Sequence, residues 1–212
     1  MYDIEIKNAI IIDGLGKEPY SGNLYVKDGK IIAITYGESF DADISIDATG
    51  KVVTPGFIDL HTHSDISFLL DSTAQSKVRQ GVTLELIGNC GLSLCAPLIG
   101  DAREMFDTWV SDHTDSYDPY WTDYAGYIDA SKKAKATVNI AFQIGHASLR
   151  LAVMGQEDRP PTADELTEMK RLAGESMDAG ALGFSTGLFY APGYYARTDE
   201  VIAIAEEAGK RN

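Results

Sequence analysis

The chain has 212 residues, of which 44% are hydrophobic and 24% are charged, a composition typical of a soluble globular protein. Its formal net charge is −14, and no run of Lys and Arg offsets the acidic excess, so nucleic acids and anionic membranes are not expected partners. No apolar stretch reaches the roughly 18 to 20 residues of a membrane helix. Because the N-terminus shows no secretory leader, we expect a cytoplasmic protein with reduced cysteines.

Residues 1–54 are predicted to form a small β domain, because short apolar strands alternate there with turn signals. The strand-like segment 2–13 is followed by the turn sequence GLGKEP, and a KDGK hairpin signal at 27–30 joins two further strands. No helical periodicity occurs before residue 70. We therefore expect this segment to be the N-terminal part of a β-sandwich.

Residues 55–212 change to alternating strands and helices, which predicts an α/β fold with a parallel sheet covered on both faces. A capping signature at Thr162–Glu165 begins one helix, Ser72 is a candidate cap for another, and residues 101–134 form a helical insertion. This rhythm by itself fits either a doubly wound sheet or a (β/α) barrel. The four apolar strands are expected at VVTPGFIDLHTH (52–63), GVTLELIGNCG (81–91), KATVNIAFQIGHASL (135–149) and GALGFSTGLFY (180–190).

His61 and His63 stand one residue apart at the end of the first of these strands. Residues at i and i+2 of a strand point to the same face with Cα atoms about 6.5 to 7 Å apart, so two imidazoles there can bind one metal ion. Asp59 and Asp65 have the same parity and could orient or supplement these ligands. Core histidines bonded to backbone carbonyls are the alternative, but the flanking aspartates favour a metal site.

Cys90 ends the second strand next to a glycine, and taken alone it is either a small buried hydrophobe or a ligand. Two histidines and a thiolate together would suit Zn²⁺. We expect Cys95 to be a packing or loop residue and His113, in a polar insertion, to be solvated. His146 ends the third strand and is a candidate ligand, substrate contact or loop-fixing residue.

The segment 180–200 combines small residues with aromatic ones. Gly183, Ser185 and Gly187 share one face of the fourth strand, which leaves room either for a ligand or for a tight layer of a barrel. The tyrosines and Arg197 that follow could line a pocket with polar tips, or simply pack on the protein's own surface. The sequence GFSTG is not a nucleophile elbow, and no phosphate-binding glycine motif is present.

The segment VVTPGFIDLHTHSD, coming after a small β segment, resembles the entry to the barrel of the amidohydrolase superfamily. Within that superfamily, GVTLELIGNCGLSLCAP, IGHASLR and GALGFSTGLFYAPGYYA resemble the D-aminoacylases, or N-acyl-D-amino-acid deacylases, and the resemblance covers nearly the whole chain. It implies a metal-dependent (β/α)8 TIM barrel, of which about the first four βα units lie in these residues. The implied reaction is hydrolysis of small-molecule N-acyl-D-amino acids to a carboxylate and a D-amino acid.

The resemblance also implies ligands for Zn²⁺ at His61, His63 and Cys90, the thiolate taking the place of a carboxylated lysine found in many relatives. The fourth strand, ALGFSTG, indeed contains no lysine. The tightest zinc is expected on Cys90 with histidines of the fifth and sixth strands, and the two histidines here would hold a second, weaker position. An aspartate of the eighth strand would be the general base for a metal-activated water. Candidate substrate contacts are Tyr190, Arg150, Arg197 and His146.

The chain ends at Asn212, before those later strands, so the implied site is expected to be incomplete. We therefore predict that these 212 residues alone contain no general base and are inactive, and that their unpaired edge strands can associate with another chain. Two alternatives stay open. One is a cyclic-amide hydrolase of the dihydroorotase or hydantoinase kind, although its usual fourth-strand lysine is missing, and the other is a non-catalytic fragment.

Overall fold

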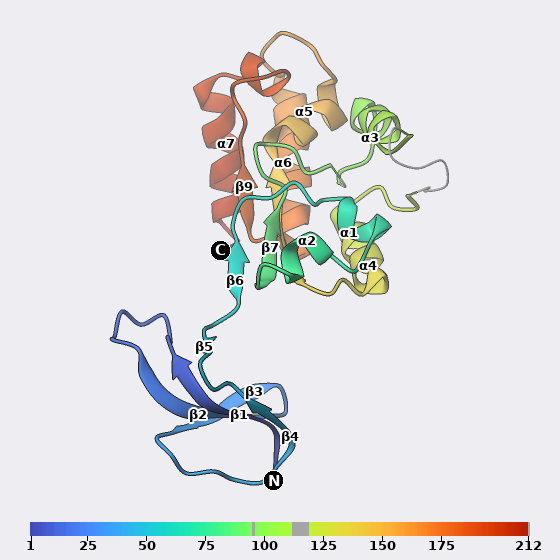
Figure 1. Ribbon diagram of the computed structural model, residues 1–212. Helices are drawn as coiled ribbons and strands as arrows, with labels where there is room; N and C mark the ends of the chain where they lie inside the picture. The colour runs from blue at the N-terminus through green and yellow to red at the C-terminus, as the bar shows by residue number, and fades with distance from the viewer. Residues whose placement is uncertain (95, 112–118, 212) are drawn as a thin grey trace. The chain divides into compact units, whose positions relative to one another are not determined.

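The computed structural model describes residues 1–94, 96–111 and 119–211 (Figure 1). The chain divides into two compact units, Met1–Gly56 and Phe57–Asn212, against an expected boundary between residues 54 and 55. The predictions for Cys95 and His113 fall outside the described residues. Among the described residues, no helix has both the length and the apolar character that a membrane span requires.

The first unit is a mixed five-stranded sheet in the order β3-β2-β1-β4, with β5 paired to β1. The predicted hairpin is confirmed: β2 and β3 pair antiparallel across Asp28 and Gly29, which both have positive φ (51° and 71°), as a type I′ hairpin turn requires. The pairs β1–β4 and β1–β5 are parallel. The strands are β1 (Tyr2–Ile11), β2 (Tyr20–Lys27), β3 (Lys30–Thr35), β4 (Ala42–Asp47) and β5 (Val52–Val53).

The second unit is built on a parallel sheet in the order β6-β7-β8-β9. Its strands are β6 (Phe57–Asp59), β7 (Val82–Ile87), β8 (Asn139–Gly145) and β9 (Gly183–Ser185). Its helices are α1 (Ser67–Leu70), α2 (Gln75–Val78), α3 (Asp101–Ser111), α4 (Tyr124–Ala134), α5 (His146–Met154), α6 (Ala163–Asp178) and α7 (Thr198–Gly209), with a 3₁₀ turn, η1 (Gly193–Tyr195). Helices α5, α6 and α7 pack one after another beside the sheet (Figure 1).

The strand order of this sheet follows the chain order, and that distinguishes the two architectures that the sequence left open. A doubly wound sheet reverses its strand order at a switch point, whereas a (β/α) barrel adds its strands in sequence. The described strands β6 to β9 show no reversal. Their arrangement therefore fits part of a barrel, and the carboxyl ends of all four strands lie at the same edge.

All four predicted strands are shorter than expected, and the fourth, predicted at 180–190, is reduced to Gly183–Ser185. The segment 52–63 is broken at Pro55 and Gly56, so β5 belongs to the first unit and only β6 joins the parallel sheet. Proline lacks the N–H that a sheet interior needs. This strand was predicted to be buried, but Phe57 and Ile58 are each 58% exposed because β6 lies at an edge of the described sheet. The third strand ends at Gly145, and α5 begins at the next residue.

Of the two predicted helix caps, one is confirmed and one is wrong. Thr162 accepts a hydrogen bond from the Glu165 N–H, while the Glu165 carboxylate accepts one from the Thr162 N–H, which is a complete capping box. Ser72 caps no helix, because α2 begins only after Ala74. The Asp71 carboxylate instead binds Thr73, and the Ser72 carbonyl accepts from Thr137.

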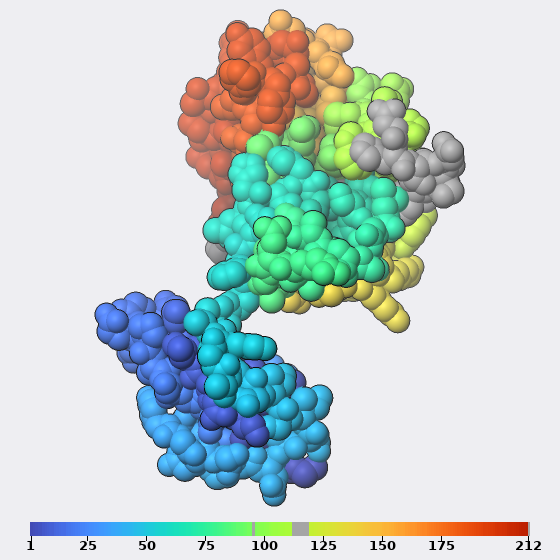
Figure 2. Space-filling model, in the orientation of Figure 1, coloured from blue at the N-terminus to red at the C-terminus, as the bar shows by residue number. Residues whose placement is uncertain are grey.

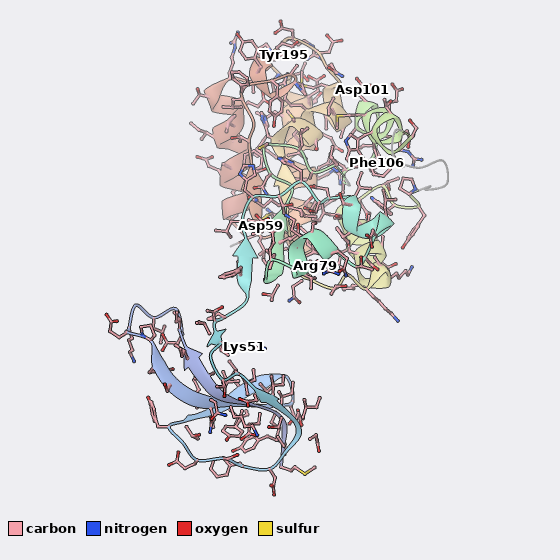
Figure 3. The ribbon with its side chains drawn as sticks, viewed as in Figure 1. Lys51, Asp59, Arg79, Asp101, Phe106 and Tyr195 are labelled. Atoms are coloured by element: carbon pink, nitrogen blue, oxygen red, sulfur yellow. The ribbon has the colours of Figure 1, made fainter. Side chains whose placement is uncertain are left out.

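The core of the second unit lies between its sheet and helices and is rich in aromatic side chains. Phe106 of α3, labelled in Figure 3, meets Trp121 edge to face at 6.3 Å between ring centroids, and Trp121 in turn contacts Tyr127 of α4. The predicted insertion at 101–134 thus contributes its helices to the core. In the space-filling view, the segment that contains α1 and α2, coloured teal to green, forms a continuous part of the outer surface (Figure 2).

The start of α6 yields a prediction about pH. Hydrogen bonds from Arg159 lower the pKa of Glu165 from 4.5 to about 2, so the charged pair stabilises the folded chain above about pH 4.5 and is lost as the pH falls towards 2. Glu165→Gln keeps a capping-box side chain but removes this charge. We expect a small loss in the free energy of unfolding at pH 7, because the pair is partly exposed, and no loss near pH 2, as measured by urea denaturation.

Thr162→Ala is the matched control, because it removes the uncharged half of the same cap. Its cost of about 0.5 to 2 kcal/mol should change much less with pH, because Arg159 and not the Thr162 side chain is the main cause of the low Glu165 pKa. A Glu165→Gln effect that is independent of pH would contradict the ion-pair explanation.

Candidate metal centre

Three ligand-type atoms, one each from His61, His63 and Cys90, lie within 4.8 Å of one another. The histidines follow β6 and the cysteine follows β7, and these neighbouring strands are parallel. Their carboxyl ends therefore bring the two segments together, although they are about 30 residues apart in the chain. His61 Nε2 lies 3.1 Å from Cys90 Sγ. The three residues that the sequence singled out as ligands thus converge on one point.

A polar network holds the segment that carries the histidines, on the face opposite to the two imidazoles. Thr62, whose side chain alternates with those of the two histidines, donates a hydrogen bond to Glu85 of β7, and Ser64 donates another. Lys77 lies 3.3 Å from the buried Glu85 carboxylate and 2.6 Å from Asp59. Each of these five side chains bonds to at least one other, so the network fixes the irregular segment after β6.

Asp59 and Asp65 were predicted to orient or supplement the metal ligands, and the structure gives each a different set of contacts. Asp59, labelled at the end of β6 in Figure 3, accepts from the His61 N–H at 3.2 Å, and the hydrogen bond from Lys77 keeps its pKa low. Asp65 is buried, which raises its pKa to about 7, and it accepts from the Gly88 N–H at 3.1 Å. Neither carboxylate belongs to the three-atom cluster found in the described residues.

Cys90 lies in a tight turn, Gly88–Gly91, that has an uncommon backbone conformation. Gly88, Cys90 and Gly91 all have positive φ, of 77°, 56° and 75°, and for a cysteine this left-handed region is sparsely populated. The side chain of Asn89 fastens the turn to the sheet by donating to Leu86 O at 2.7 Å. Gln143 of β8 donates to the Asn89 side-chain oxygen at 3.0 Å, so the turn is fastened both to its own strand, β7, and to the neighbouring β8.

The end of β9 packs directly on this turn. Ser185 donates a hydrogen bond to Gly88 O and accepts one from Gly91 N at 3.1 Å. A Cβ at Gly187 would lie 2.0 Å from the Cys90 carbonyl oxygen, so only glycine fits there. The space on this face of β9, which the sequence left open to a ligand or a tight barrel layer, is filled by the cysteine turn.

The first turn of α5 holds the same loop from another side. Ser148 N donates to Gly91 O at 3.2 Å, and the Ser148 hydroxyl accepts from Ser93 N at 2.9 Å. Gly145 N donates to the Ser93 hydroxyl at 3.1 Å. The turn with Cys90 is thus fixed by β8, α5 and β9 together.

The donor set and its geometry fit zinc. With Zn–N of about 2.0 to 2.1 Å and Zn–S of about 2.3 Å, tetrahedral ligand atoms lie about 3.4 to 3.6 Å apart, so small side-chain rotations would bring these three into place. Partial burial and the nearby His61 lower the pKa of His63, which favours the neutral imidazole that a metal requires. Three protein donors leave at least one position open for water or a further ligand.

Two of the four residues predicted to contact substrate lie in the protein interior. Arg150 is fully buried and donates to both carboxylate oxygens of Glu200, at 2.9 and 2.7 Å, and its other nitrogen donates to the carbonyls of Glu157 and Arg159. His146, also fully buried, lies 2.8 Å from the same carboxylate. These hydrogen bonds outweigh the effect of burial and lower the pKa of Glu200. The cluster ties α5 to α7.

The other two predicted residues lie in different surroundings. Tyr190 donates its hydroxyl to the Cys90 carbonyl, and burial raises its pKa, so the phenol stays protonated. Arg197 is the N-cap residue of α7, is exposed, and forms no ion pair within the part of the chain that the structure describes.

Sequence reasoning missed the polar network of Thr62, Glu85 and Lys77 behind the histidine segment. It also missed the hydrogen bonds that hold the cysteine turn and the buried Arg150–Glu200 pair. Alternating side-chain directions predicted that His61 and His63 point to the same face. The same alternation predicts that Thr62, between them, points to the opposite face, where it bonds to Glu85. No local pattern marks Glu200, which lies in an ordinary amphipathic helix.

Comparison with known proteins agrees with this geometry. The family model that matches is that of the amidohydrolase family, over residues 45–210. The D-aminoacylase of Alcaligenes xylosoxydans xylosoxydans is 38% identical over 203 residues, which cover 96% of this chain and 41% of that protein. The chain spans about two fifths of the length of the curated relatives it matches.

Solved structures agree in fold along the whole chain. The structure of N-acyl-D-glutamate deacylase from Bordetella bronchiseptica, complexed with zinc and a phosphonate inhibitor, has a TM-score of 0.85 and 34% identity, covering 99% of this chain and 43% of that one. A D-aminoacylase described with a binuclear metal centre has a TM-score of 0.90 and 34% identity, covering 100% of this chain and 44% of its own.

The resemblance to the D-aminoacylases is thereby confirmed, with this chain corresponding to their N-terminal part. Its parallel sheet, its histidine pair and its cysteine turn all lie within or beside the matched residues. The chain belongs to the amidohydrolase family.

Proposed function

We propose that this chain provides the first part of the zinc site of an N-acyl-D-amino-acid deacylase, a hydrolase of non-peptide C–N bonds. The observation that carries the proposal is the convergence of His61, His63 and Cys90 at the carboxyl ends of two parallel strands. The similarity to N-acyl-D-amino-acid deacylases over nearly the whole chain supports the substrate class.

Zinc bound there would polarise the scissile amide and lower the pKa of a water molecule. The residues of this chain hold that position: His61 and His63 offer imidazole nitrogens, and Cys90 offers a thiolate in place of a carboxylate. In the proposal, Cys90 shares the tighter zinc with residues of the longer protein, and the two histidines complete a second, weaker site. Cys90 is half-buried, whereas both histidines are exposed.

For the substrate carboxylate, we propose Arg197 and Tyr190 as the donors from this chain. Arg197 is an exposed guanidinium without an ion-pair partner among the described residues, and such a group binds a carboxylate well. Tyr190 lies against the Cys90 turn, so a substrate amide at the metal would come close to it. Arg150 and His146 are left out of this proposal because both side chains are fully buried, with Glu200 bonded to both and backbone carbonyls to Arg150.

Hydrolysis also needs a general base near the metal. No carboxylate joins the three donors in the described cluster, and the relatives are more than twice as long as this chain. We therefore propose that the base and further ligands come from the rest of a longer protein. Apolar side chains at both edges of the parallel sheet support this, since Leu60 is 66% exposed and Leu182 is 63% exposed.

The first test concerns the cysteine ligand in the full-length protein. Cys90→Ala removes the thiolate, so zinc affinity should fall by more than the roughly 10- to 100-fold typical of losing an outer-shell partner. Hydrolysis of N-acetyl-D-amino acids should fall with it. Competition with a chelating dye measures the affinity, and release of the free amino acid measures the activity.

Cys95→Ala is the matched control, and it should retain both zinc and activity. Removing metal from the wild-type protein with a chelator should abolish hydrolysis, and added Zn²⁺ should restore it. Full activity in the metal-free protein, or unchanged zinc binding in Cys90→Ala, would contradict the proposed function.

A second test concerns the 212 residues by themselves. We expect no detectable hydrolysis of N-acetyl-D-amino acids by the purified chain, because no carboxylate of the described residues joins the three donor atoms. We also expect concentration-dependent self-association, because β6 and β9 present unpaired edges in the described sheet. Light scattering measures the association. Measurable turnover by this chain, at the rate of the longer protein, would show that the site is already complete.

A further inference from the structure

We infer that Ser185 is a positioning residue for the Cys90 ligand, and that its hydroxyl sets the conformation in which the thiolate faces the two histidines. The inference rests on the proposed zinc site and goes beyond it, because it assigns metal affinity to a residue that touches neither the metal nor the substrate.

The first step is the geometry of the turn that carries Cys90. In an ordinary four-residue turn, the first carbonyl accepts directly from the fourth N–H. In Gly88–Gly91 these two groups do not bond to each other within the described structure. The Ser185 hydroxyl stands between them, donating to Gly88 O and accepting from Gly91 N at 3.1 Å. One side chain therefore holds both ends of the turn apart, with Cys90 inside it.

The second step is the conformation that this bridge maintains. Cys90 has a φ of 56°, a region that a non-glycine residue keeps only when its surroundings hold it there. Without the hydroxyl, Gly88 O and Gly91 N would both lose a partner and could bond directly. That closure would change the backbone angles of the turn and rotate the Cys90 side chain, whose Sγ now lies 3.1 Å from His61 Nε2.

The third step is that β9 is shaped for this contact. A Cβ on Gly91 would lie 2.7 Å from Gly187 N, and a Cβ on Gly187 would lie 2.0 Å from Cys90 O. These two glycines let the strand end approach the turn closely enough for a short serine side chain to reach both of its ends. Ser185 thus connects the fourth strand to a ligand that lies 95 residues earlier in the chain.

The test uses the full-length protein loaded with Co²⁺, whose thiolate charge-transfer band reports the Cys90–metal bond. Ser185→Ala should weaken Co²⁺ binding by about 10- to 100-fold, as expected for an outer-shell partner, and should change the charge-transfer band. Ser185→Thr, which keeps the hydroxyl, should bind like wild type. Ser185→Val, which has the same shape as Thr without the hydroxyl, should behave like Ser185→Ala.

Ser176→Ala is the control for loss of a hydroxyl that donates to a backbone carbonyl elsewhere, because Ser176 donates to Leu172 O within α6 and is even more buried than Ser185. It should leave Co²⁺ affinity and the band unchanged. Wild-type affinity in Ser185→Ala, or an equal loss in Ser176→Ala, would overturn the inference while leaving the zinc site intact.

Two other outcomes are also decisive. If circular dichroism shows that neither Ser185→Ala nor Ser185→Val folds, the hydroxyl serves the fold and not the ligand, and the inference is wrong. If the wild-type protein shows no thiolate band, Cys90 is not a ligand, and the proposed zinc site fails together with the inference.

Discussion

The close contact between the Gly88–Gly91 turn and the end of β9 is the constraint on which the candidate site depends. It places Cys90 in a left-handed conformation that an L-residue rarely adopts, and it turns the thiol towards His61. The contact is possible because glycine stands at 91 and 187 and a short hydroxyl at 185. A larger residue at either glycine would separate the two segments, and the three donor atoms would no longer share one point.

The two ligand segments are supported in different ways, and each support has a physical reason. The histidine segment has no regular ladder beyond β6, so a charged network of Lys77, Glu85 and Asp59 fixes it from behind. A buried carboxylate such as Glu85 would be costly alone, and its cost is offset by a cation and two hydroxyl donors. The cysteine turn is instead held by hydrogen bonds from uncharged groups.

Much of the fold was predictable because it follows from local patterns. The hairpin at Asp28–Gly29, the capping box at Thr162 and the alternation of strands with helices depend on neighbours within a few residues. Two predictions failed where local sequence did not decide the outcome. Pro55 interrupts an apolar run that looks like one continuous strand. Ser72, expected to cap a helix, caps none, and Asp71 instead accepts hydrogen bonds from Thr73. Sequence alone also gave no sign that Arg150 and His146, two candidate substrate contacts, bond in the interior to Glu200, from a helix about 50 residues later.

The sequence by itself determined the chemistry that this chain can offer: two histidines of equal parity, a cysteine at the next strand end, a parallel α/β layout and the family to which the chain belongs. Only the tertiary structure decided which groups meet. The bridge from Ser185 to the cysteine turn, the network under Thr62 and the buried Arg150–Glu200 pair all join residues more than 20 positions apart. Such contacts follow from how strands and helices pack, and periodicity along the chain does not record packing.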